Sequence, residues 1–194
     1  DDHERGQVGD RLRVQGLKIH LDNGEGTVIN WESDDVTAAI GRANGAGWQV
    51  SVHAVSTEAV EMVLDAYEVA LGPTGPNPLH HRLDHAIQVS DEQLARMVAM
   101  DLATVIHPDG GAGDWVIWSK YLGHESPDKL EGGTAWLTRW RDFMDAGLHV
   151  AAATDTPWFL PDSKLTDDFS RPVDQIAGGM DGRNRTYPGT PDWM

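Results

Sequence analysis

The sequence predicts an α/β protein built on a parallel sheet. Short runs of β-compatible residues alternate with amphipathic helical segments between residues 16 and 155, and strict alternation of strands and helices is typical of parallel sheets whose strands are buried on both sides. A chain of 194 residues with 40% hydrophobic content can build one sizeable core. We therefore expect one domain over residues 1–194.

The first half of the chain contains three predicted strands with two helices between them. Strands are expected over residues 16–22, 48–55 and 81–87, and helices over residues 33–45 and 56–72. Ser33 is the expected capping residue of the first helix, and Gly72-Pro73 closes the second. The second helix carries an apolar stripe made by Val60, Val63, Leu64, Tyr67 and Leu71.

The second half continues the pattern with strands over residues 102–108 and 147–155. Ser90 and Gln93 form a capping box for a helix, which buries Leu94, Met97, Val98 and Leu102. A further helix is expected around residues 134–147, with Trp136, Trp140 and Phe143 on one face. The glycine-rich segment 108–133 follows a strand end, and we expect it to act as a substrate lid.

Charge and composition exclude several classes of partner. The formal net charge is −16, and 15 Lys and Arg are outnumbered by 31 Asp and Glu, so the chain lacks the basic face that a nucleic acid requires. No run approaches the roughly 18 apolar residues of a membrane span, and we expect no membrane partner. With no cysteine, a bound metal must use His, carboxylate or a modified Lys.

Polar residues recur in phase along the predicted strands. Lys18, His53, His85 and Asp155 are separated by 35, 32 and 70 residues, which correspond to one, one and two βαβ units of roughly 30 or more residues. In an α/β barrel the carboxyl ends of all strands meet at one mouth. Lys, two His and Asp meeting there would form a site for Zn²⁺ or a similar divalent ion.

Three segments resemble the amidohydrolase superfamily, and specifically the family-3 branch that includes N-substituted formamide deformylases: "VHAVSTEAVEMVLDAYE", "HRLDHAIQVSDEQLARMVAMDLATVIHP" and "GLHVAAATDTPW". The resemblance implies a (β/α)8 TIM barrel and a metal-dependent hydrolase. It also implies His53 and His85 as metal ligands, Lys18 as a ligand that a carboxylate group can convert into a metal bridge, and Asp155 as ligand or general base.

The sequence also departs from that pattern. Asp22-Asn23-Gly24 stands where Asp-Gly is usual, Ser56-Thr57 replaces Gly-Asp, Asp84 replaces Glu, and His107-Pro108 replaces Gln-Pro. A His-x-His pair, which the superfamily carries on its first strand, is absent from the sequence. Because only five strands can be identified where a barrel needs eight, we expect an incomplete barrel of about five βα units, the C-terminal part of a larger catalytic domain.

An incomplete barrel predicts association. Five parallel strands leave two open edges and an inner face, expected to be apolar, that three more strands would cover. We expect either a homo-oligomer or a complementing N-terminal segment to cover them. The expected location is the cytoplasm of a bacterial cell, with the periplasm or secretion as alternatives.

The resemblance implies hydrolysis of a non-peptide C–N bond in a small amide-type substrate, such as an amide, an N-substituted formamide or a cyclic amide. One or two divalent ions, most readily Zn²⁺, would activate water, and Asp155 would carry its proton to the leaving nitrogen. Arg82, His107 and Trp115 are the expected substrate contacts, although Arg82 can equally pair with Asp84. The alternatives are a catalytically silent metal-binding or scaffold fragment, and a deaminase of the same superfamily. His20, His80, His81 and His149 are out of phase and are expected at the surface or behind the site.

Overall fold

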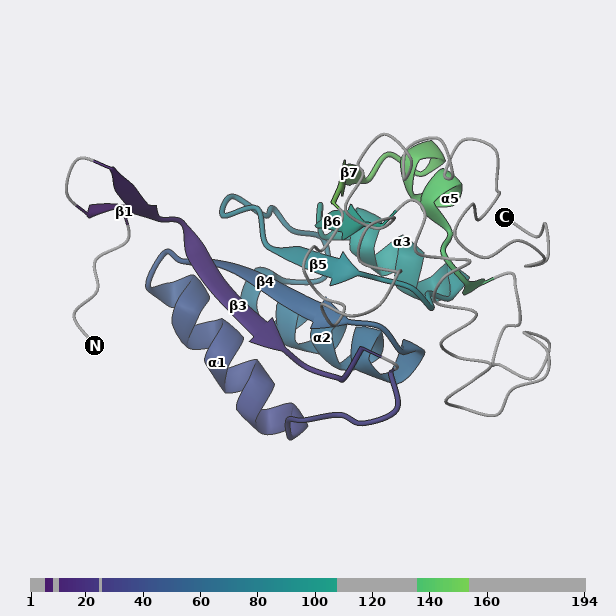
Figure 1. Ribbon diagram of the computed structural model, residues 1–194, viewed down its shortest axis with the longest axis horizontal. Helices are drawn as coiled ribbons and strands as arrows, with labels where there is room; N and C mark the ends of the chain where they lie inside the picture. The colour runs from purple at the N-terminus through teal and green to yellow at the C-terminus, as the bar shows by residue number, and fades with distance from the viewer. Residues whose placement is uncertain (1–5, 9–10, 25, 108–135, 154–194) are drawn as a thin grey trace, which may run out of the picture.

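A computed structural model of the chain describes residues 6–8, 11–24, 26–107 and 136–153 (Figure 1). Five parallel strands form one sheet in the order β3-β4-β5-β6-β7. Their bounds are β3 Gly16–His20, β4 Gln49–Ala54, β5 Arg82–His85, β6 Ala103–Ile106 and β7 His149–Ala152. All five predicted strands are confirmed, each shorter than its expected range.

Four helices in the described ranges connect these strands: α1 Ser33–Gly45, α2 Thr57–Leu71, α3 Asp91–Ala99 and α5 Trp140–Asp145. The predicted capping box of Ser90 and Gln93 begins α3. The expected cap at Ser33 is wrong, because α1 is preceded by Glu32 and has no side-chain cap. The last helix is shorter than predicted, so that Trp140 and Phe143 are buried on it while Trp136 precedes it.

A short antiparallel hairpin precedes the parallel sheet. It consists of β1 Gly6–Val8 and β2 Leu12–Val14, which pair with each other. This hairpin was not expected from the sequence, because three-residue strands are too short to produce a clear alternation of apolar and polar residues.

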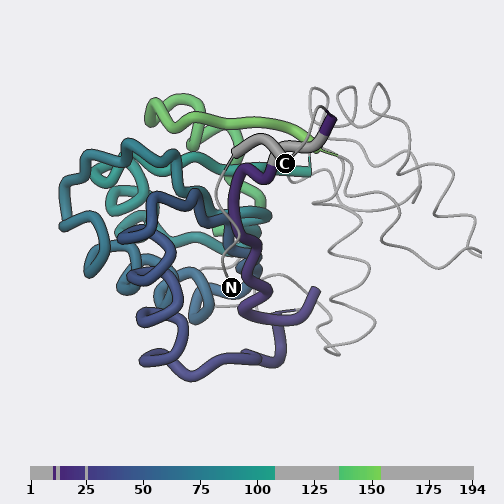
Figure 2. Tube along the Cα trace, turned by 90° about the vertical axis from the view of Figure 1, so that its left-hand side faces the viewer, coloured from purple at the N-terminus to yellow at the C-terminus, as the bar shows by residue number. Residues whose placement is uncertain are grey.

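The two faces of the parallel sheet differ in character. Helices α1, α2 and α3 lie together on one face (Figure 2), and the strand residues buried beneath them are apolar: Ile19, Val50, Val52, Leu83 and Ile106. Because side chains alternate along a strand, the opposite face carries the residues between them: Lys18, His20, Ser51, His53, Arg82 and Asp84. The expectation of an apolar inner face is therefore wrong for these positions.

None of the helices described here is long and apolar enough to cross a membrane.

A buried histidine joins β4, β5 and the first two helices. His81 is fully buried, its Nδ1 accepts a hydrogen bond from the Val50 amide at 2.9 Å, and its Nε2 lies 2.9 Å from Asn44 Oδ1. Its ring stacks on Tyr67 with centroids 5.5 Å apart. The expectation that this histidine lies at the surface or behind the site is wrong, since it holds the core together at the start of β5.

His81 predicts an acid-sensitive fold. Burial lowers the pKa of His81 from 6.5 to about 4, so between these values the unfolded chain binds more protons than the folded chain and stability falls as the pH falls. The contribution of neutral His81 to the free energy of unfolding is fully present above pH 6.5. Below pH 4 up to about 3 kcal/mol of it is lost, because a tenfold change in proton affinity corresponds to about 1.4 kcal/mol.

Urea unfolding between pH 4 and pH 7.5 measures this effect. His81→Gln should be less stable than the wild type at pH 7.5 and should lose less stability on acidification, whereas His80→Gln, at the exposed neighbouring position, should follow the wild type. Equal acid sensitivity in all three proteins would contradict the assignment to His81.

Candidate active site

Four histidines form a row where four neighbouring strands end. His20, His53, His85 and His107 stand at the carboxyl ends of β3, β4, β5 and β6. Consecutive ring centroids along this row are 4.5, 4.3 and 4.7 Å apart. The carboxyl ends of parallel strands are where ligands bind in α/β folds, so this histidine row is the candidate site.

The backbone places the His85 ring in the row. Asp84 faces the inner side of the sheet, so a regular strand would turn His85 toward the helices. Instead His85 and Ala86 have φ angles of 75° and 46°, in the left-handed region that costs a non-glycine residue of order 1–3 kcal/mol. This turn brings the His85 ring against both His53 and His107. Strain of this kind concentrates at functional sites.

The surroundings of His85 keep its ring neutral. Burial, and then the nearby His53, His107, Lys18 and His20, lower the pKa of His85 to about 2. A neutral imidazole is the form that binds a metal ion. His85 therefore holds a ligand-competent ring throughout the physiological pH range.

Asp84 connects the cationic side chains of the inner face. Its carboxylate forms an ion pair with Lys18 and accepts a hydrogen bond from Ser51 Oγ. Arg82 Nε lies 2.9 Å from Asp84 Oδ1, close enough for an ion pair although the two groups are not aligned as a hydrogen bond. Asp84 is buried while about 40% of each cationic side chain is exposed. Lys18 and Arg82 are thus drawn toward one carboxylate beside the histidine row.

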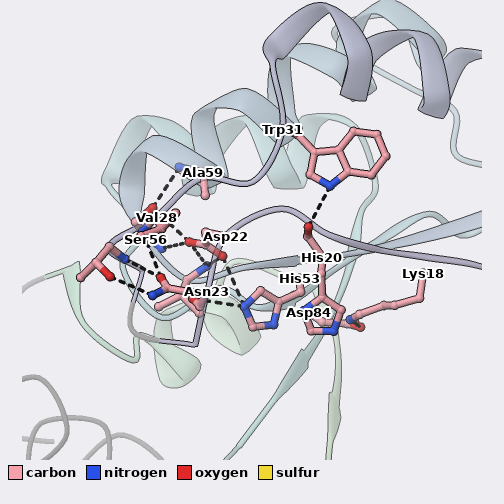
Figure 3. A network of polar contacts seen from close by, with 12 residues as sticks. Lys18, His20, Asp22, Asn23, Val28, Trp31, His53, Ser56, Ala59 and Asp84 are labelled. Atoms are coloured by element: carbon pink, nitrogen blue, oxygen red, sulfur yellow. Dashed lines mark hydrogen bonds and ion pairs between the residues drawn. The ribbon is translucent and has the colours of Figure 1, made fainter. Parts of the chain in front are cut away.

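The loop after β3 lies at the end of the histidine row that begins with His20. Asp22 is buried, and its carboxylate accepts hydrogen bonds from the Val55 amide, the Ser56 amide and the Ser56 hydroxyl at 2.9–3.1 Å. Asn23 closes the loop by accepting from the Thr27 amide. The Trp31 indole donates to the His20 carbonyl at 2.9 Å (Figure 3). These bonds fix the loop on the end of the sheet next to His53.

His53 has one ring nitrogen that lacks a partner. The residue is only 3% exposed, and its Nε2 lies 3.3 Å from Asp22 Oδ1 and 3.5 Å from the Asn23 carbonyl oxygen. Its Nδ1 is buried without a hydrogen-bond partner in the described part of the chain. A buried unsatisfied nitrogen is costly and needs an explanation, and a metal ligand is one that fits this residue type.

The structure brings together most of the predicted site residues. Lys18, Arg82, His53, His85 and His107 all lie on the inner face or in the histidine row, whereas Asp155, Trp115 and the expected lid over 108–133 fall outside the described residues. Among the described residues no three His, Asp or Glu side chains already converge on one point as metal ligands. The predicted fourth ligand, Asp155, belongs to the part of the chain that is not described.

Sequence reasoning missed two members of the site. His20 was treated as out of phase, yet it lies two residues after Lys18 and pairs in register with His53, so strand alternation could have placed it on the inner face. The sequence predicted no role for Asp22. Its signal was weak, because it acts after the strand has ended, where alternation no longer applies.

The fold and site define a class of protein. Over 97% of its length the chain matches 38% of an uncharacterized metal-dependent hydrolase from Pyrococcus horikoshii OT3, with a TM-score of 0.68 and 23% identity. A second uncharacterized metal-dependent hydrolase, from Pyrococcus furiosus, matches with a TM-score of 0.62 at 23% identity, covering 89% of this chain and 38% of that one. The five parallel strands and their helices thus match part of the barrels of these metal-dependent hydrolases.

The family model of the amidohydrolase family matches residues 3–166, and the chain belongs to that family, in its family-3 branch. It is 30% identical over 146 residues to the protein YtcJ of Bacillus subtilis (strain 168), and 28% identical over 116 residues to the N-substituted formamide deformylase of Arthrobacter pascens. These matches cover 74% and 60% of this chain but only 23% and 20% of the relatives. The matched part of the chain therefore spans about a fifth of each relative's length.

The ion pair between Lys18 and Asp84 predicts that Lys18 stays unmodified. Carboxylation would convert the Lys18 cation into an anion beside the Asp84 carboxylate, and like charges in contact repel. Removing the negative charge in Asp84→Asn should raise the carboxylated fraction of Lys18 several-fold. The measurement is ¹³C NMR of the protein equilibrated with ¹³C-bicarbonate.

Arg82→Gln serves as the control for this experiment. It removes a neighbouring cation but keeps the Asp84 carboxylate, so it should leave Lys18 unmodified. A carboxylated Lys18 in the wild-type chain without a second metal ion would contradict the prediction.

Proposed function

We propose that this chain supplies part of the metal site of a hydrolase that cleaves a non-peptide C–N bond in a small amide-type substrate. Its substrate would be an amide, an N-substituted formamide or a cyclic amide. The observation that carries the proposal is the unpartnered, buried Nδ1 of His53 beside the neutral ring of His85. Membership of the amidohydrolase family and likeness to metal-dependent hydrolases support it.

The residues at the strand ends fit a divalent cation. His53 and His85 would hold it, with Asp155 as the third ligand, and Zn²⁺ is the ion that such nitrogen and carboxylate ligands suit. When bound, the ion lowers the pKa of its water and polarises a carbonyl group. A second ion would require Lys18 in its carboxylated form as a further ligand.

The chain's own groups would carry out the remaining tasks. Asp155 would accept a proton from the attacking water and deliver it to the leaving nitrogen. His107, stacked on His85, and the half-exposed Arg82 would orient the substrate carbonyl, with Trp115 from the segment after β6 covering its apolar part. The neutral ring of His85 requires no deprotonation before it acts as a ligand.

Zinc binding tests the proposed ligands directly. His53→Ala and His85→Ala should each weaken Zn²⁺ binding at least tenfold, measured by calorimetric titration of the purified chain, because each substitution removes one of the few ligands. His149→Ala is the matched control, since this exposed histidine lies at the start of β7, away from the carboxyl ends of the strands. Unchanged affinity in both site variants would refute the proposed site.

Hydrolysis assays distinguish the enzyme from a silent metal-binding fragment. With Zn²⁺ added, the chain should hydrolyse at least one member of a panel of N-substituted formamides and N-acyl amino acids, and His53→Ala should lower that rate at least a hundredfold. Tight zinc binding without any hydrolysis would favour the scaffold function.

A further inference from the structure

Asp22 lies beside the His53 ring. The carboxylate is 1% exposed, and each of its closest polar neighbours is a hydrogen-bond donor. Oδ2 receives three donors, the amides of Val55 and Ser56 and the Ser56 hydroxyl. Oδ1 shares the Val55 amide and faces His53 Nε2 at 3.3 Å (Figure 3).

These contacts favour one position for the hydrogen on the His53 ring. Both oxygen atoms near Nε2, Asp22 Oδ1 and the Asn23 carbonyl oxygen, can only accept a hydrogen bond. Nε2 must therefore carry the hydrogen to satisfy either of them. In the neutral ring this leaves Nδ1 with its lone pair, and Nδ1 is the buried atom without a partner in the described residues.

We propose that Asp22 is a positioning residue that fixes His53 in the Nε2–H tautomer and thereby reserves Nδ1 as the metal-binding atom. A carboxylate that accepts a hydrogen bond from the second ring nitrogen of a metal-binding histidine commonly raises the affinity for the ion 10- to 100-fold. This inference rests on the proposed function, because the atom controlled by Asp22 is the one proposed to bind the ion.

The local fold explains how Asp22 is held in place. Leu21 donates its amide to the His53 carbonyl at 3.1 Å, which continues the pairing of β3 with β4 beyond the end of β3. Ser56 caps α2 by accepting from the Ala59 amide, and the same hydroxyl donates to Asp22. The carboxylate thus bridges the end of β3 and the start of α2, and its own orientation leaves Oδ1 toward His53.

Asp22→Asn tests the tautomer. The three donors at Oδ2 should retain the amide oxygen of Asn at that position, which turns its NH₂ group toward His53 Nε2. Nε2 would then accept, and the hydrogen would move to Nδ1. We expect ¹H–¹⁵N NMR of the histidine rings to show Nε2–H in the wild type and Nδ1–H in the variant, with the His53 signal assigned by its loss in His53→Gln.

Zinc titration of the same proteins supplies the second readout. Asp22→Asn should weaken Zn²⁺ binding 10- to 100-fold. Ser56→Ala is the matched control, because it removes one donor to Asp22 and the cap of α2 but leaves Oδ1 facing His53. It should keep the wild-type tautomer, bind Zn²⁺ within about twofold of the wild type, and unfold at a lower temperature.

Each result has a distinct meaning. Nδ1–H in the wild-type chain would overturn the proposal even if Asp22→Asn fails to fold. Equal loss of zinc affinity in Ser56→Ala and Asp22→Asn, with the wild-type tautomer in both, would also overturn it and assign Asp22 a purely structural role. A tautomer change without zinc binding by any of the proteins would uphold Asp22's control of the ring and refute the proposed metal site.

Discussion

Parallel pairing of five strands in sequential order is the constraint from which the site follows. Because the strands run in one direction, their carboxyl ends meet at one edge, and residues far apart in sequence, such as His20 and His107, become members of one row. Among the described residues, helices α1, α2 and α3 cover one face with apolar contacts. The inner face can therefore hold charges and imidazoles, which pair with one another instead of packing against hydrocarbon.

The sequence predicted the regular parts of this arrangement and failed where regularity ends. The alternation of strands and helices identified all five parallel strands, and the spacing of Ser90 and Gln93 identified the capping box. Both signals are local in the sequence. His85 was placed at the correct strand end, but its left-handed backbone and its contact with His107 depend on neighbouring strands. The spacing of residues along the sequence does not indicate such contacts.

The charged residues show the same division. Arg82 was predicted either to anchor a substrate or to pair with Asp84, and the structure shows the pairing. Asp22 escaped prediction because its partners, Val55 and Ser56, lie more than 30 residues away. The prediction for His81 was wrong because a histidine usually lies at the polar surface, whereas two specific hydrogen bonds satisfy this one inside the core.

The pairing of Lys18 with Asp84 also affects the shape of the sheet. These residues belong to β3 and β5, so their contact passes over β4 and spans two strand spacings of about 4.8 Å each. Attraction between opposite charges across a middle strand draws the outer strands together on the face away from the helices. Curvature in that direction is what barrel closure requires, so this single ion pair favours the curvature of a barrel wall.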